Sequence, residues 1–175
     1  FLFSFNDFYL IQFSELSVSL ERRDSRNFSF EEANNLPLPY NITGVTLLTF
    51  VSKNLDVADG LGFALVGAHT IGRAHCYTLG FSPLDPNMDK TLAKILNSTC
   101  PSTDSSNSAN LDIRTPKGFL NKYYINLMNH QVLFTSDQDL FTDKRTKNIV
   151  EAFAHDQTLF FEKFVDGFIR MSQLD

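Results

Sequence analysis

The spacing of hydrophobic and polar residues predicts a mainly helical chain from about residue 41 onward. Apolar side chains recur there three and four positions apart, as they do on the buried face of an amphipathic helix. No clear strand ladder accompanies them, so the pattern indicates an all-α domain. The helical segments are expected at about residues 43–51, 59–69, 91–96, 119–127, 149–153 and 161–168.

Polar stretches rich in Ser, Asn, Gly and Pro separate these segments. Residues 80–89 and 101–110 are expected to form loops, the second of them well solvated. Thr142 or Asp143 is expected to cap the helix at 149–153, because a side-chain oxygen at that position can accept from a free backbone N–H.

The N-terminal third carries weaker signals. Residues 1–14 are rich in Phe and Tyr, and the first three Phe alternate as in a strand until Asn6 and Asp7 interrupt them. We interpret this stretch as a packing segment without chemistry. Residues 21–41 are polar and irregular, and two prolines in three residues, Pro37 being the first, force an extended path.

Composition narrows the possible partners. The chain has 175 residues, enough for one domain with a sizeable core. Hydrophobic residues make up 43% and charged residues 20%, an ordinary balance for a soluble domain. The net charge of -5 argues against a nucleic-acid partner, because no basic patch is available to replace phosphate counterions. No apolar run reaches the roughly 18 residues that a membrane span needs.

Cysteines and glycosylation triplets bear on the compartment. Cys76 and Cys100 are the only cysteines, and on their own they can be two buried thiols or one disulfide. Acceptor triplets begin at Asn27, Asn41 and Asn97, which together with a Cys pair favour a secreted, oxidising setting. The chain opens without Met, basic region or small-residue cleavage site, so no signal peptide is present and we expect the chain to be incomplete or processed.

His69 is the most interesting of the four histidines. It ends an apolar helical run and is flanked by small residues, which leave room for something large and flat to approach. A neutral imidazole there can ligate haem iron, or it can be a core residue bonded to backbone. The pattern does not favour a zinc site at His69, because His69, His75 and Cys76 lack the short ligand spacing and a fourth ligand nearby.

Residues 67–76 read Gly-Ala-His-Thr-Ile-Gly-Arg-Ala-His-Cys, which resembles the proximal haem-ligand motif of plant secretory (class III) haem peroxidases. Further segments resemble the same family in the same order, at residues 18–25, 35–39, 111–116, 121–124, 133–138, 160–165 and 170–174. The resemblance spans residues 16–175. It implies a partial haem peroxidase domain there, the proximal half of the fold truncated at both ends, after an unmatched Phe-rich segment at 1–15.

The resemblance also implies roles around a haem b group. His69 would be the axial iron ligand. Asp137 would accept a hydrogen bond from the other ring nitrogen of His69, making the imidazole more electron-donating. Pro37 would border the channel of the reducing substrate.

A calcium site and a disulfide follow from the same resemblance. Thr70, Asp112 and Thr115 would help to hold a proximal Ca²⁺, while Leu120 stands where a ligating Asp is expected and should weaken that site. The family's proximal disulfide would join Cys76 to Cys100.

The implied function is H₂O₂-dependent oxidation of phenolic donors, in hydrogen peroxide breakdown and the response to oxidative stress, by a secreted monomeric glycoprotein. The family's distal Arg and His, four apart in sequence, have no counterpart, because no Arg-x-x-x-His occurs here. That pair moves the peroxide proton and stabilises developing charge. The alternatives are a non-catalytic haem-binding or degenerate secreted protein, and a fragment of a longer gene product. The residues of this chain favour these alternatives.

Overall fold

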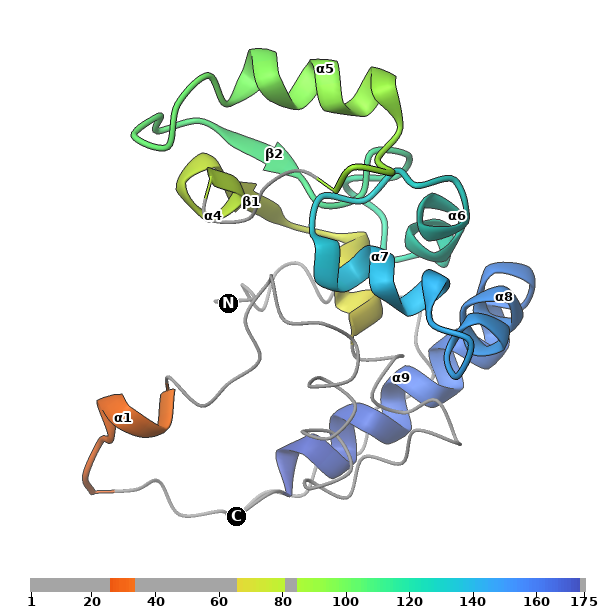
Figure 1. Cartoon of the computed structure of the whole chain (residues 1–175). Coiled ribbons are helices and arrows are strands. Elements are labelled where there is room, and N and C mark those ends of the chain that lie inside the picture. The colour runs from red at the N-terminus through yellow and green to blue at the C-terminus, as the bar shows by residue number, and fades with distance from the viewer. Residues whose placement is uncertain (1–25, 34–65, 81–84, 174–175) are drawn as a thin grey trace.

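The computed structural model describes residues 26–33, 66–80 and 85–173, and helices dominate those ranges (Figure 1). This confirms the all-α prediction. The segments expected at 1–15 and 43–51, and the start of the helix before His69, lie outside the described residues. The elements are α1 (Phe30–Ala33), the 3₁₀ helix η2 (Gly67–Thr70), β1 (Arg73–His75), α4 (Cys76–Gly80), α5 (Lys90–Thr99), β2 (Ser108–Asn110), α6 (Lys122–Met128), α7 (Thr135–Thr142), α8 (Lys147–His155) and α9 (Gln157–Ser172).

An aromatic core joins α6, α8 and α9. Tyr124 and Phe160 are fully buried, their ring centroids lie 5.1 Å apart, and Phe153 and Phe119 pack against Phe160. Large aromatic side chains dominate core energetics, and four of the 18 Phe are buried in this cluster. Its buried members are Phe119, Tyr123, Tyr124, Leu127, Val132, Leu140, Val150, Phe153, Ala154, Phe160 and Phe164.

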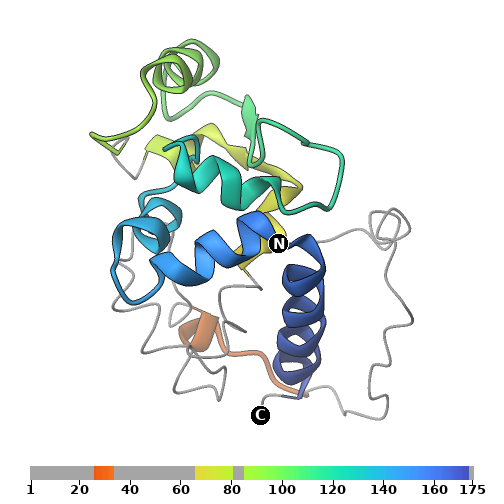
Figure 2. The same ribbon diagram turned by 90° about the vertical axis from the view of Figure 1, so that its right-hand side faces the viewer.

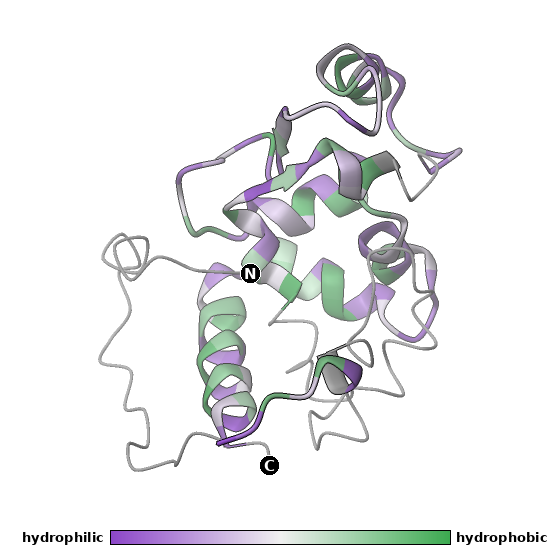
Figure 3. Cartoon of the chain, turned by 90° about the vertical axis from the view of Figure 1, so that its left-hand side faces the viewer, coloured by the Kyte–Doolittle hydropathy of each residue, from purple (hydrophilic) through white to green (hydrophobic). Residues whose placement is uncertain are grey.

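α9 is stabilised by its N-cap residue, which precedes Gln157, and by its apolar side. The Asp156 side chain accepts from the backbone N–H of Leu159 at 3.0 Å and so caps the helix. Figure 2 shows α9 at a steep angle to α8. Figure 3 shows apolar residues along much of α9, with polar residues between them. The helix expected at 161–168 is confirmed, but its buried positions are Phe160, Phe164 and Gly167, so the buried face begins one residue before the expected segment.

A smaller core lies between α5, the strands and the segment before α7. α5 begins at Asp89, whose carboxylate accepts from Leu92 N–H at 2.9 Å, and it buries Leu92 and Leu96. A disulfide joins Cys76 to Cys100, with Cα atoms 5.2 Å apart and a sequence separation of 24, and so ties α4 to the end of α5. Buried in this core are Ala74, Leu79, Met88, Leu92, Leu96, Ala109, Leu111, Leu133 and Phe134.

The sequence pattern did not reveal one short pair of strands. β1 and β2 pair antiparallel, with Ala74 opposite Ala109, and residues 108–110 therefore belong to a strand rather than to the loop expected at 101–110. Gly72, at φ 95°, turns the chain into β1. Each strand has only three residues, too few for alternation to stand out in the sequence.

Two further expectations need correction near α7. Thr142 ends α7 and Asp143 is its C-cap, so neither caps α8; the N-cap of α8 is Thr146, whose buried hydroxyl donates to the Leu140 carbonyl. α7 itself was not predicted, because its first five residues are polar and its apolar pattern is weak.

Among the described residues, no helix has both the length and the apolar character needed to cross a membrane.

Candidate functional site

His69 lies in η2, a single tight turn between residue 66 and β1. Gly67 and Thr70 in this turn are buried, and the side chain of His69 keeps 20% of its surface exposed. The chain leaves the turn through Ile71 in an extended conformation and then through Gly72 at φ 95°. η2 thus presents one imidazole at the edge of the aromatic core.

Asp137 holds one nitrogen of His69. Nδ1 of His69 lies 3.1 Å from each carboxylate oxygen of Asp137, and the Asp137 side chain is only 4% exposed. A carboxylate can only accept, so Nδ1 carries a proton, and in the neutral imidazole Nε2 then carries the lone pair. Burial lowers the pKa of His69, but the charge and hydrogen bond of Asp137 outweigh it and raise that pKa above its ordinary value.

The start of α7 aims Asp137 at η2. The backbone N–H groups of Asp137 and Gln138 donate to the Phe134 carbonyl, which begins the helix, and Gln138 Nε2 donates to the Leu127 carbonyl at 3.1 Å. This last bond locks α7 onto α6. The Phe134 and Tyr123 rings stand edge-on to the His69 ring, with centroids 5.8 Å and 6.0 Å away.

Gly67 lets the turn lie directly on the core. A Cβ atom at this position would come within 2.4 Å of Tyr124 Oη and 2.5 Å of Phe160 Cε2. Side-chain carbon atoms do not approach that closely, so only Gly fits here. The small residue that sequence reasoning associated with space for a ligand is thus also required for packing.

Hydrogen bonds to Asp112 bring together the three residues expected to bind calcium, which are Thr70, Thr115 and Asp112 itself. The hydroxyls of Thr70 and Thr115 donate to Asp112 Oδ2 at 3.0 Å and 2.8 Å. Oδ1 accepts from the backbone N–H groups of Arg114 and Thr115 and from Nδ2 of Asn126 at 2.7 Å. Thr70 and Asp112 are fully buried. The turn that carries His69 is therefore tied to α6 through Asp112.

The side chain of Leu120 contributes no oxygen atom to this cluster. Its Cδ1 comes 3.4 Å from where a Cβ of Gly118 would stand, so it packs back onto its own turn. In the described ranges, no group of three or more His, Cys, Asp or Glu side chains is placed to hold a metal ion. The side chains of Thr70, Asp112 and Thr115 themselves offer one carboxylate and two hydroxyls.

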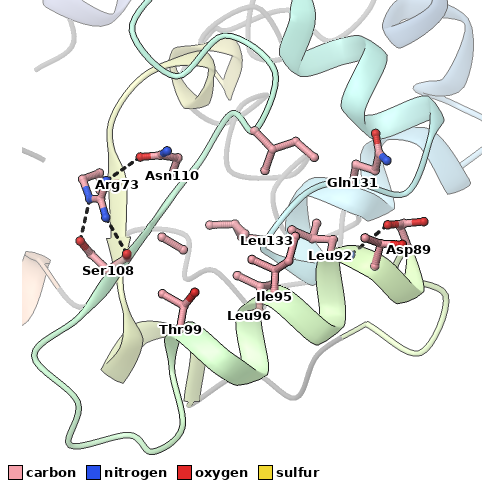
Figure 4. Close-up of a pocket in the computed structure, with 13 residues that line it drawn as sticks. Arg73, Asp89, Leu92, Ile95, Leu96, Thr99, Ser108, Asn110, Gln131 and Leu133 are labelled. Carbon is pink, nitrogen blue, oxygen red and sulfur yellow. Dashed lines mark hydrogen bonds between the residues drawn. The ribbon is translucent and has the colours of Figure 1, made fainter.

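A groove of about 500 Å³ opens elsewhere, between α5 and β2 (Figure 4). Leu92, Leu96 and Leu133 line it, and Arg73 stands at its β2 end, where its guanidinium donates to Ser108 and Asn110 at 2.7 Å. None of the predicted haem or calcium residues borders this groove. Pro37, the predicted channel residue, lies outside the described residues.

Sequence reasoning missed two buried polar residues of the site, Tyr123 and Asn126. Tyr123 falls within the amphipathic helix expected at 119–127, where it counts as an apolar position, and its ring does belong to the core. Asn126 had no role, although a fully buried amide on a helix needs hydrogen-bond partners and so signals a polar cluster.

Comparison with known proteins places the chain in a family. The peroxidase family model matches residues 10–156. Peroxidase 12 of Arabidopsis thaliana is 48% identical over 165 residues, which cover 91% of this chain and 46% of that protein. Cationic peroxidase SPC4 of Sorghum bicolor is 41% identical over 162 residues, 90% of this chain and 44% of that protein. The chain therefore belongs to the plant peroxidase family, and it spans about half the length of these relatives.

Replacing Gly67 should destabilise the protein. In Gly67→Ala the new methyl group meets Tyr124 and Phe160, and overpacking of this kind typically costs about 1–3 kcal/mol. Urea unfolding followed by circular dichroism measures the change. Gly118→Ala is the matched control, since its methyl group would lie at ordinary contact distances, 3.4 Å or more, from the Leu120 side chain and the Thr115 carbonyl. Equal stability of the two variants would contradict the close packing of η2.

Proposed function

We propose that the chain forms the iron-ligand side of a haem peroxidase, with His69 as axial ligand of haem b. The observation that carries this proposal is the His69–Asp137 pair, held on a glycine-lined turn in a chain of the peroxidase family. The donor set fits the group, because a neutral imidazole with Nδ1–H bonded to a carboxylate directs its lone pair outward from Nε2. When bound, haem supplies the iron chemistry by which peroxidases reduce H₂O₂ and oxidise a small-molecule donor.

The residues of this chain then have distinct tasks. Asp137 keeps the proton on Nδ1, fixes the ring orientation and makes the imidazole more electron-donating. Tyr123 and Phe134 hold the ring edge-on, and Thr70 anchors the turn through Asp112. Pro37 would border the access channel of a phenolic donor.

Other parts of the proposal follow the family resemblance. We infer a secreted, glycosylated monomer active in peroxide breakdown under oxidative stress, with residues 16–175 forming the peroxidase domain and 1–15 lying outside it. The disulfide between Cys76 and Cys100 supports an oxidising compartment.

A second candidate function is haem binding without turnover. No Arg-x-x-x-His occurs within the 175 residues. Moving the peroxide proton from one oxygen to the other requires an acid and base above the haem, and a nearby cation stabilises the charge that develops. Arg73 and His75 lie in β1, shortly after the turn that carries His69, and we infer that they would not fill these roles.

His69→Ala should abolish haem binding. Purified chain mixed with haemin is expected to show a shifted Soret band, and the alanine variant removes the nitrogen that ligates the iron. Absorbance titration measures this. His155→Ala is the control, an exposed histidine at the end of α8 that should leave the shift unchanged. A full Soret shift in His69→Ala would refute the assignment.

Calcium should bind weakly or not at all. Ca²⁺ takes about six to eight oxygens, and Leu120 offers none, so calorimetry should detect no binding tighter than about 10⁻⁴ M. Leu120→Asp restores a carboxylate and should tighten binding measurably, whereas Leu120→Ala should not. Micromolar affinity in the unaltered chain would mean that another oxygen has taken the place of the lost carboxylate.

The haem-loaded chain alone should react slowly with peroxide. Stopped-flow measurement of the haem absorbance change after mixing with H₂O₂ should give a second-order rate at least about 10²-fold below that of a full-length plant relative, because general acid–base catalysis contributes at least that factor. A rate near that of the relative would sink the prediction and require a catalytic group not yet identified in the chain.

A further inference from the structure

Tyr123 has a buried hydroxyl that the core alone does not explain. Its side chain is 0% exposed, and among the described residues its oxygen has no hydrogen-bond partner. Leaving a buried hydroxyl unpaired costs free energy, and a phenylalanine at this position would fill the same space without that cost. An unpaired hydroxyl of this kind points to a role beyond packing.

The charged group beside that hydroxyl is Asp137. The Tyr123 ring stands edge-on to His69 at 88°, and the Asp137 carboxylate lies against the same imidazole. Burial first, and then the charge and hydrogen-bonding capacity of Asp137, raise the pKa of Tyr123 well above its ordinary value. A phenol hydroxyl is a hydrogen-bond donor, and the carboxylate of Asp137 is an acceptor.

Asp137 can accept such a donor. Of the described residues, only His69 donates to its side chain, and it does so with a single N–H. A carboxylate offers about four lone-pair sites. A small movement of the Tyr123 hydroxyl would satisfy one of these sites and would pair the hydroxyl itself.

We propose that Tyr123 is a positioning residue for the His69–Asp137 pair, its hydroxyl donating to Asp137 and limiting the negative charge that the carboxylate presents to Nδ1 of His69. A carboxylate that shares a second donor pulls less strongly on the imidazole proton. Tyr123 thereby sets how electron-donating His69 is. This last step rests on the proposed haem ligation, whereas the contact with Asp137 does not.

Tyr124 provides a matched comparison on the same helix. It is the next residue, equally buried, and carries the same hydroxyl, but that hydroxyl lies against Gly67. The influences that raise or lower the pKa of Tyr124 are burial and the Gly67 backbone, and Asp137 is not among them. Replacing either tyrosine by Phe removes one oxygen atom, and only one of the two should act through Asp137.

A double-mutant cycle on the full chain without haem tests the contact. Tyr123→Phe, Asp137→Asn and the double variant are unfolded in urea, alongside the same cycle with Tyr124→Phe. The Tyr123 cycle should depart from additivity by at least about threefold in the unfolding equilibrium constant, as groups in contact do. The Tyr124 cycle should be additive to within about twofold. Additive behaviour of Tyr123 and Asp137 would overturn the proposal.

The haem-loaded chain tests the consequence with single variants. Tyr123→Phe should make the iron midpoint potential more negative and raise the iron–histidine stretching frequency in resonance Raman spectra, since Asp137 then pulls harder on His69. Tyr124→Phe should leave both close to those of the parent chain. No change in Tyr123→Phe would contradict the tuning role. Failure of the parent chain to bind haem would instead refute the proposed function, and the cycle without haem would still decide the contact.

Discussion

The hydrogen bond between Nδ1 of His69 and the carboxylate of Asp137 is the interaction on which the site depends. It joins η2 to α7 across 68 residues of sequence, with only 4% of the Asp137 side chain exposed. A hydrogen bond to a charged group contributes about 1.5–3 kcal/mol, and it counts for more where water is excluded. The rest of the site keeps both partners in place. Gln138 fastens α7 to α6, and the missing Cβ of Gly67 lets η2 settle on the rings of Tyr124 and Phe160.

A second buried carboxylate, that of Asp112, also holds η2 in place. Thr70, the residue after His69, donates to Asp112, and Asp112 also accepts from Asn126 on α6. A buried carboxylate is costly unless its lone pairs are used, and five protein donors use those of Asp112. The orientation of His69 therefore rests on two hydrogen-bonded carboxylates rather than on the short 3₁₀ turn, which could not fix it alone.

The parts of the fold that the sequence predicted are those with a strong apolar period. The helices near 119–127, 149–153 and 161–168 each place large side chains at helical spacing, and each was found to within a few residues. The β1–β2 pair and α7 were missed because three-residue strands and a polar helix start leave no period to detect. Asp137 was named only through the family motif, since in isolation it resembles a solvated turn residue. Tyr123 was hidden inside an apolar stripe, because a pattern of apolar positions does not register a hydroxyl.

Peroxidase chemistry has two requirements, electron donation to the iron and proton transfer at the peroxide, and the described residues bear only on the first. With His69 as the iron ligand proposed above, electron donation to the iron would depend on Asp137 and on the buried groups around it, which lie within residues 66–173. Proton transfer at a peroxide would need an acid–base pair, and no Arg-x-x-x-His lies among the 175 residues. Under that proposal, iron binding and proton transfer would rest on different residues. Substitutions at Asp137 or Tyr123 would then alter the strength of the iron–histidine bond without touching the groups that would move the proton.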